Sequence, residues 1–158
     1  MFAIRRILHP TDFSPPAKAA LRLACSLAED YGAELTLIHV WDPLIVTGEK
    51  PHPHLPTNSL EEALAWLDAV EVAAPSVRSF RHLVVGNPVN EIVLEAKEGA
   101  ADLIVMGTRG RTGLNRLLMG SVAEGVLRKA PCPVLTVRET PAADRTAWVA
   151  PDSELACV

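Results

Sequence analysis

The sequence has few cysteines, no long apolar run and no surplus of basic residues, and each absence excludes a class of protein. Its three cysteines, Cys25, Cys132 and Cys157, are odd in number and unrelated in spacing, which fits neither a disulfide framework nor a zinc site. No apolar run approaches the roughly 20 residues of a membrane-spanning helix, so we expect no membrane partner. The basic pair near the N-terminus lies inside an apolar segment and not ahead of it, unlike in a signal peptide. We therefore expect a cytoplasmic protein.

Acidic residues outnumber basic ones, with 19 Asp and Glu against 15 Lys and Arg, and the formal net charge is −4. Binding along a nucleic acid backbone needs a net basic face, so this balance argues against nucleic acid as the partner. Apolar residues make up 49% of the 158 residues and charged residues 22%. This composition is that of a globular chain with a substantial core.

Apolar, strand-like runs alternate with amphipathic, helix-like segments along most of the chain. We expect strands at 3–8, 34–40, 77–85, 102–106 and 134–137, and helices at 15–31, 60–70, 88–98 and 121–129. The alternation predicts an α/β fold, a Rossmann-like open parallel sheet of five strands with helices on both faces. Residues 1–138 would form this one domain, and residues 139–158, rich in Pro, Ala and charge, an extended or partly disordered tail. Residues 43–56 are rich in proline and predict a surface loop.

Local signals mark the helix ends and the helix faces. Ser14 before Pro15, Ser59, and Asn87 before Pro88 are typical helix starts, and Gly32 is a typical end. The apolar spacing also predicts which side chains meet the sheet. For the first, second and last helices these are Ala17, Leu21, Ala24, Ala28 and Tyr31; Ala63, Leu64 and Leu67; and Val122, Val126 and Leu127.

The segment from Leu103 to Val122 joins an apolar run to a glycine-rich turn. The run ends at Gly107, and further glycines follow at Gly110, Gly113 and Gly120, the last directly before a serine. Glycine lets a ligand or another backbone approach closely. The amides of such a turn, together with those of a helix that starts near Gly120, would converge on an anion.

Three arginines, Arg109, Arg111 and Arg116, lie in the same segment, so a phosphate group is the expected ligand. The spacing is not that of a Walker A loop, because no Gly-Lys-Ser/Thr occurs in the chain. Nor is it the dinucleotide fingerprint, because two residues and not one separate the first two glycines. One alternative stays open, a tight strand-to-helix turn whose glycines serve packing alone.

The pattern Gly107-x-x-Gly110, nine residues, then Gly120-Ser121 resembles the nucleotide-binding signature of the universal stress protein family, and more narrowly of its ATP-binding branch. Four further segments resemble the family: HPTDFS, LIHV, VVGNPVNEIV and APCPVLTV. The resemblance extends from about Ile4 to Val137. It implies a five-stranded sheet in the order 3-2-1-4-5 and a homodimer that pairs through the last strand.

Carried over by position, the resemblance implies three groups of residues around a nucleotide. The first holds the base and ribose, the second lies near the ribose, and the third surrounds the phosphates. In that order they are Pro10, Thr11, Asp12 and Val40; Met106 and Gly107; and Gly110, Arg111, Gly120, Ser121 and Val122. The ligand would be ATP, or AMP or ADP, with Mg²⁺ accompanying the triphosphate. No catalytic residue and no metal cage of the protein's own is implied.

Several polar residues have simpler interpretations. Asp12 is equally a candidate cap for the first helix. His9 is more typical of a packed residue at a strand end, and His39 of a core histidine with a hydrogen-bond partner. His52 and His54 form His-x-His in the proline-rich loop, and two ligands are too few for a metal site.

Three functions follow from these features. The first is a stress-response regulator that binds a nucleotide at the carboxyl edge of the sheet and acts as a dimeric, nucleotide-dependent switch. The second is a slow ATPase or nucleotide transferase, against which stands the lack of a nucleophile–base pair near the loop. The third is a dimeric scaffold or chaperone-like protein without nucleotide, against which the intact glycine signature speaks.

Overall fold

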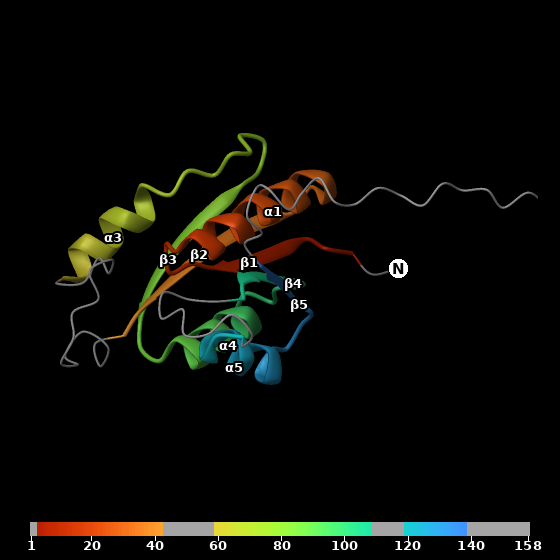
Figure 1. Cartoon of the computed structure of the whole chain (residues 1–158). Coiled ribbons are helices and arrows are strands. Elements are labelled where there is room, and N and C mark those ends of the chain that lie inside the picture. The colour runs from red at the N-terminus through yellow and green to blue at the C-terminus, as the bar shows by residue number, and fades with distance from the viewer. Residues whose placement is uncertain (1–2, 43–58, 109–118, 139–158) are drawn as a thin grey trace, which may run out of the picture.

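Five strands form one parallel sheet in the order β3-β2-β1-β4-β5, with helices between successive strands (Figure 1). The structure is a computed structural model that describes residues 3–42, 59–108 and 119–138. Its elements are β1 (Arg6–Pro10), α1 (Pro15–Tyr31), β2 (Glu34–Trp41), α3 (Leu60–Asp68), β3 (Ser79–Val85), α4 (Pro88–Glu98), β4 (Leu103–Gly107), α5 (Ser121–Lys129) and β5 (Val134–Val137). The predicted fold class and strand order are confirmed.

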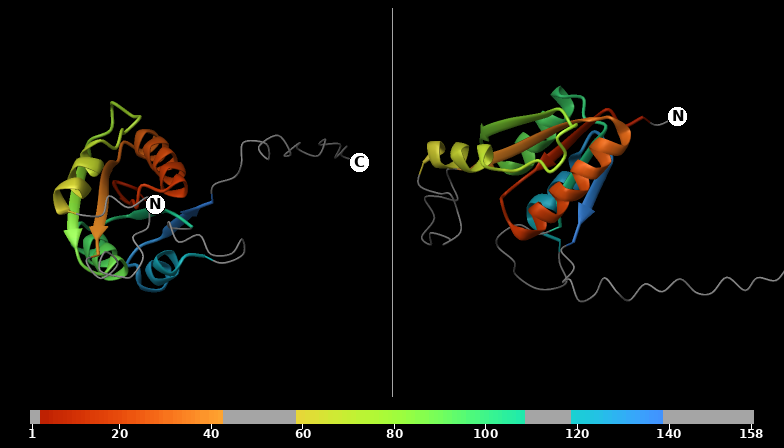
Figure 2. Two further views of the ribbon diagram at one scale, coloured as in Figure 1. Left: turned by 60° about the vertical axis from the view of Figure 1, so that its left-hand side comes forward. Right: turned by 90° about the horizontal axis from the view of Figure 1, so that it is seen from above.

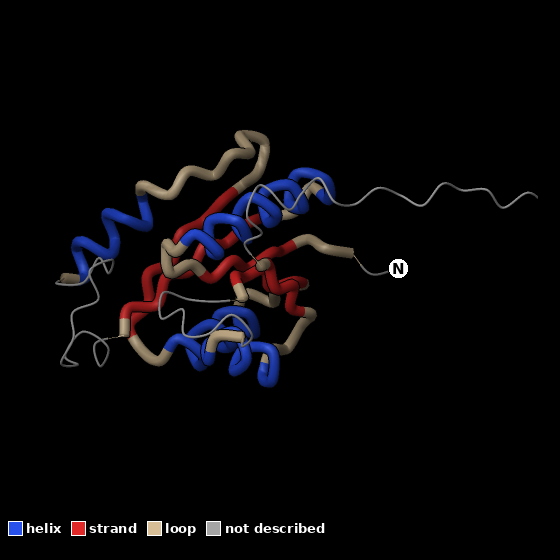
Figure 3. Tube along the Cα trace, viewed as in Figure 1, coloured by secondary structure: helices blue, strands red, loops and turns tan. Residues whose placement is uncertain are grey.

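The helices cover the sheet in two layers, α1 and α3 on one face and α4 and α5 on the other (Figure 2). Figure 3 shows the strands enclosed between these layers. Side chains alternate between the two faces along each strand. Ile7 therefore packs with α1 and α3, whereas the next residue, Leu8, packs with α4 and α5. The sheet thus has an apolar core on both sides, as expected when helices cover both faces of a parallel sheet.

The predicted helix starts and the predicted end of α1 are confirmed. The side chains of Ser14, Ser59 and Asn87 each accept a hydrogen bond from the backbone N–H three residues further on, at 3.4, 3.2 and 3.3 Å. Gly32 ends α1 in the left-handed conformation, with φ of 62°. These contacts satisfy backbone groups that a helix end leaves without an intrahelical partner. The observed bounds of α1 therefore agree with the bounds predicted from the sequence.

Some predicted bounds and helix faces were wrong in detail. The third strand begins at Ser79 and not at residue 77, and α3 ends at Asp68 and not at residue 70. The first strand runs from Arg6 to Pro10, and not over residues 3–8, because its pairing with β2 begins only where Arg6 meets Glu34. On three helices, the buried apolar face, here called the apolar stripe, is narrower than the spacing of the apolar residues suggested. Tyr31, Leu64 and Leu127 are exposed by 56, 47 and 41%. Each lies at the border of its stripe.

Three predicted features lie outside the described residues. They are the proline-rich loop at 43–56, the tail at 139–158, and the site residues Gly110 and Arg111. In the part of the chain that the structure describes, every helix is too short or too polar to cross a membrane.

Candidate functional site

The predicted site lies where the strand order reverses, beside β1. The chain passes from β1 to β2 on one side of this strand, and later adds β4 and β5 on the other side. Open α/β sheets bind their ligands at the carboxyl edge at this point. The predicted residues that the structure describes come from the ends of β1, β2 and β4 and from the start of α5 (Figure 1).

Three apolar residues of the predicted site lie on the same face of the sheet. Met106 is 5% exposed and belongs to the core cluster between the sheet and α4 and α5. Val40 and Val122 are half-buried and pack against this cluster. The structure therefore brings the ends of β2 and β4 together with the first turn of α5.

The loop from Thr11 to Ser14 links β1 to α1 and is held by its own polar side chains. One carboxylate oxygen of Asp12, Oδ1, accepts hydrogen bonds from the backbone N–H of Ser14 at 3.0 Å and from its hydroxyl at 2.5 Å. The hydroxyl oxygen of Thr11 accepts from the N–H of Phe13 at 3.1 Å. The interpretation of Asp12 as the cap of α1 is wrong, because Ser14 is the cap and Asp12 holds it. The role of Asp12 toward a ligand stays a prediction.

Two histidines of the core hold neighbouring backbone carbonyls. His39 donates from Nδ1 to the carbonyl of Thr11 at 2.8 Å, and His9 donates from Nδ1 to the carbonyl of Val105 at 2.8 Å. His39 is 7% exposed and His9 is fully buried, which confirms both as core residues. Burial lowers the pKa of His9 to about 4, against the opposing effects of its Val105 hydrogen bond and the nearby charge of Asp12. His9 is therefore neutral at physiological pH.

Gly107 is explained by packing. A Cβ at this position would lie 3.0 Å from the carbonyl carbon of Pro16 and 3.1 Å from the backbone nitrogen of Ala17. Both are backbone atoms of the first turn of α1, and neither can move away cheaply. A side chain at residue 107 would crowd this contact, so the end of β4 or the start of α1 would have to shift by a few tenths of an ångström. The packing alternative is therefore sufficient for this one glycine of the signature.

Gly120 differs from Gly107 in its surroundings. Its φ of −63° and ψ of 149° are open to any residue, so the backbone conformation does not require glycine. Gly120 is the N-cap of α5 but provides no side-chain cap, whereas Ser14, Ser59 and Asn87 cap the other described helices. The N–H of Gly120 donates to the carbonyl of Thr108 at 2.8 Å. The start of α5 is thereby tied to the end of β4.

The structure describes nine of the predicted residues, namely Pro10, Thr11, Asp12, Val40, Met106, Gly107, Gly120, Ser121 and Val122. Ser121 is exposed, and Pro10 and Thr11 are buried. The sequence did not indicate Thr108, whose N–H donates to Val137 at 2.9 Å while its carbonyl accepts from Gly120. Its contacts are made by the backbone, so its residue type carried no signal.

The fold and this edge of the sheet define an α/β protein with an open parallel sheet whose strand order reverses at β1. The sequence model of the universal stress protein family matches residues 3–138. A universal stress protein of Methanocaldococcus jannaschii is 39% identical over 140 residues, which cover 85% of this chain and 82% of the relative. The chain belongs to the universal stress protein family.

Two solved structures are similar in fold and in sequence. A second protein of Methanocaldococcus jannaschii is 33% identical, with a TM-score of 0.73 and coverage of 88% of this chain and 99% of its own. A universal stress protein from Archaeoglobus fulgidus, solved in complex with dAMP, is 27% identical, with a TM-score of 0.61. The alignment covers 87% of this chain and 99% of that one. A member of the family thus binds an adenine nucleotide.

Proposed function

We propose that this protein binds an adenine nucleotide, ATP, ADP or AMP, at the carboxyl edge of the sheet and acts as a nucleotide-dependent regulator of the stress response. The start of α5 is the observation that carries the proposal. Gly120 leaves this helix without a side-chain cap, although its backbone conformation does not require glycine. The amides of a first helical turn bind phosphate well, since they combine free N–H donors with the positive end of the helix dipole.

The base and ribose would lie toward β1 and β2. Asp12 is half-buried in the loop after β1, and a carboxylate there suits a ribose hydroxyl or an amino group as hydrogen-bond donor. Val40 at the end of β2 and Pro10 at the end of β1 supply apolar contact to the base. Met106 and Gly107 would lie near the ribose.

The phosphates would lie toward α5. Gly120, Ser121 and Val122 form its first residues, and the signature adds Gly110 and Arg111. Within residues 3–42, 59–108 and 119–138, no three His, Cys, Asp or Glu side chains form a group that would hold a metal ion. Mg²⁺ would therefore enter on the triphosphate and not on a cage of these residues.

Replacement of Gly120 by Val tests the proposed phosphate site. A Val side chain would occupy space meant for phosphate, while its φ and ψ stay allowed. We expect at least about tenfold weaker ATP binding in calorimetry, with unchanged circular dichroism. Leu127→Ala serves as the matched control, because Leu127 is exposed at the far end of the same helix.

Identification of nucleotide released from the denatured wild-type protein, by chromatography and mass spectrometry, completes this test. Equal ATP affinity of Gly120→Val and wild type would refute the proposed phosphate site. A wild-type protein that is purified empty and also fails to bind added ATP with Mg²⁺ would refute nucleotide binding altogether.

We propose further that two copies pair through β5. This strand is last in the strand order, so its outer edge has no neighbour within the described sheet. Leu135 on β5 is 38% exposed, which leaves apolar surface at that edge. An unprotected edge strand is a template for pairing with another chain. Leu135→Lys should shift the mass measured by light scattering from dimer to monomer, and an unchanged dimer mass would exclude this interface.

A further inference from the structure

His39 contacts the residues on both sides of Asp12. Its Nδ1 donates a hydrogen bond of 2.8 Å to the backbone carbonyl of Thr11, which precedes Asp12. Its ring lies 4.6 Å, centroid to centroid, from the ring of Phe13, which follows Asp12. Both contacts are made from β2, a strand hydrogen-bonded on both sides, and His39 itself is 7% exposed. One buried side chain on a rigid strand therefore contacts both neighbours of Asp12, whose carboxylate is the predicted ligand contact.

The contact with Thr11 determines where the chain leaves the sheet. The paired register of β1 with β2 ends where Pro10 meets Ile38, and the N–H of Thr11 still donates to the carbonyl of Ile38 at 2.9 Å. The carbonyl of Thr11 accepts from the imidazole of the next residue of β2. Two successive residues of β2 thus hold both polar backbone groups of Thr11, and the loop departs from a fixed position.

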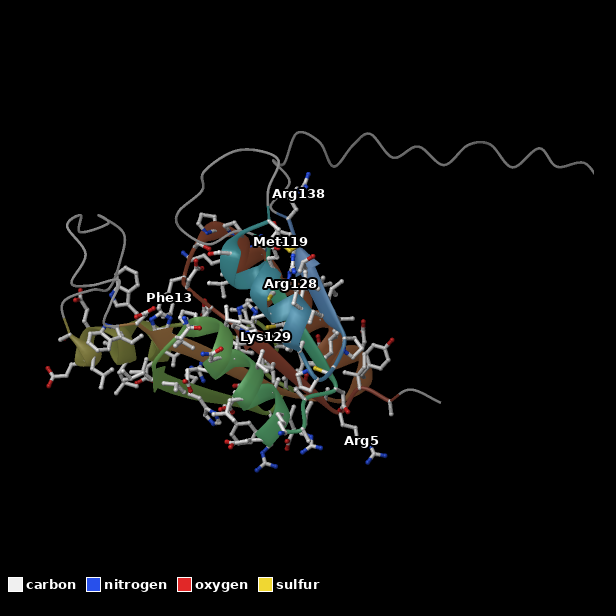
Figure 4. All side chains as sticks on the ribbon, turned by 90° about the horizontal axis from the view of Figure 1, so that it is seen from below. Arg5, Phe13, Met119, Arg128, Lys129 and Arg138 are labelled. Carbon is white, nitrogen blue, oxygen red and sulfur yellow. The ribbon has the colours of Figure 1, made fainter. Side chains whose placement is uncertain are left out.

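The contact with Phe13 helps to hold this residue in a strained backbone conformation. Phe13 has φ of 63°, a left-handed conformation that is unusual for a bulky residue and is kept only where surrounding contacts impose it. Its ring meets His39 on one side and the edge of Trp66 in α3 on the other, at 5.7 Å between ring centroids. Figure 4 shows Phe13 beside α3. The hydrogen bonds within the loop determine its shape, whereas the aromatic contacts determine its position on the sheet.

We infer that His39 is a positioning residue of the nucleotide site: it fixes the loop that presents Asp12 to the base and ribose. The inference rests on the proposed function. It adds to that function by naming His39 as the residue that fixes the position of Asp12 relative to Val40. The next residue of β2 is Val40, which would contact the base. A shift of His39 would therefore move the ribose contact relative to the base contact.

Three variants test the inference in the full chain. His39→Phe keeps a ring but removes the donor to Thr11, and His39→Asn keeps an N–H donor close to the place of Nδ1. Leu37→Ala is the control, since Leu37 is fully buried on the same strand and belongs to the core cluster beneath α1 and α3. Binding of ATP and of adenosine is measured by calorimetry, and stability by thermal unfolding.

We expect His39→Phe to bind both ATP and adenosine about tenfold more weakly, the effect of a lost buried hydrogen bond. Adenosine should be affected as strongly as ATP, because the loop serves the base and ribose and not the phosphates. His39→Asn should recover part of the lost affinity, and Leu37→Ala should lower the melting temperature with unchanged affinity. Equal affinities of His39→Phe and Leu37→Ala would overturn the inference.

A measurement without ligand separates the inference from the proposed function. The N–H groups of Phe13 and Ser14 are hydrogen-bonded within the loop, and their hydrogen exchange reports how firmly the loop is held. Exchange at both amides should be about tenfold faster in His39→Phe than in Leu37→Ala. If the wild-type protein binds no nucleotide, the proposed function fails, and this exchange still decides whether His39 positions the loop.

A second variant keeps the test decisive if His39→Phe does not fold. Phe13→Gly suits the positive φ and removes the ring that contacts His39, so it should fold and show faster exchange at the Ser14 amide. Exchange as slow as in the wild type, in either variant, would mean that the loop is held by its own hydrogen bonds alone.

Discussion

His9 should make the stability of this fold fall in mild acid. The imidazole is fully buried in β1, donates from Nδ1 to the carbonyl of Val105, and has its Nε2 buried without a hydrogen-bond partner. Burial lowers its pKa from 6.5 to about 4. In the unfolded chain the same group takes up a proton near pH 6.5, so below that pH the unfolded state binds more protons than the folded state. Stability is therefore complete above about pH 6.5 and is lost as the pH falls toward 4.

The size of the effect follows from the difference between the two pKa values. A difference of 2.5 units, from 6.5 to about 4, corresponds to about 3 kcal/mol, since each unit is worth roughly 1.4 kcal/mol. Most of this loss should be present by pH 4.5. It is large compared with the roughly 5 to 15 kcal/mol of a typical domain.

Urea unfolding at pH 7.5 and at pH 4.5 measures this loss, with His9→Asn as the reference. Asn retains a side-chain N–H for the carbonyl of Val105 and has no titrating group. The carboxylates titrate in both proteins, so their contribution cancels in the comparison. Wild type should lose about 2 to 3 kcal/mol more than His9→Asn between the two pH values. The same loss in both proteins would refute the argument that His9 is buried in its neutral form.

Two further predictions concern the turns next to the site. Gly107→Ala should lower the free energy of unfolding by about 1 to 3 kcal/mol, because its Cβ would meet the backbone of Pro16 and Ala17, and an unchanged urea midpoint would contradict that packing. Ser14→Ala removes the cap of α1 and one partner of Asp12, so we expect a loss of about 1 kcal/mol. A melting temperature equal to that of the wild type would show that another group caps this helix.

The fold could be predicted because its signals are local. Ser14, Ser59, Asn87 and Gly32 mark helix ends through contacts within a few residues, and the apolar periods separate strands from helices. Those contacts do not depend on how the elements pack. The border residues of the helix stripes were wrong for the opposite reason. Whether a side chain such as Tyr31 is covered depends on neighbouring elements, which a helical period does not contain.

The candidate site was predictable in its location but not in its internal contacts. The glycine spacing and the acid after β1 placed it at the carboxyl edge of the sheet. The bond from His39 to Thr11 joins residues 28 apart. His9 and Val105, whose carbonyl accepts the hydrogen bond from His9, are 96 residues apart in the sequence. A histidine within an apolar strand predicts burial and one partner, but nothing in its neighbourhood names that partner.

Gly107 and Gly120 show why a glycine signature should not be interpreted as one feature. At Gly107 a side chain would crowd the backbone of α1, so packing favours glycine there whether or not a ligand binds. At Gly120 the conformation would accept any residue, and the cap position would be better filled by Ser, Asn or Asp for the stability of α5. Glycine lowers the stability of α5 by only about a few tenths of a kcal/mol relative to those caps, and a phosphate bound at the first turn of the helix would favour a residue without a side chain. Packing therefore accounts for Gly107 but not for Gly120, and of these two positions only Gly120 should allow a substitution that changes the affinity for nucleotide and leaves the stability unchanged.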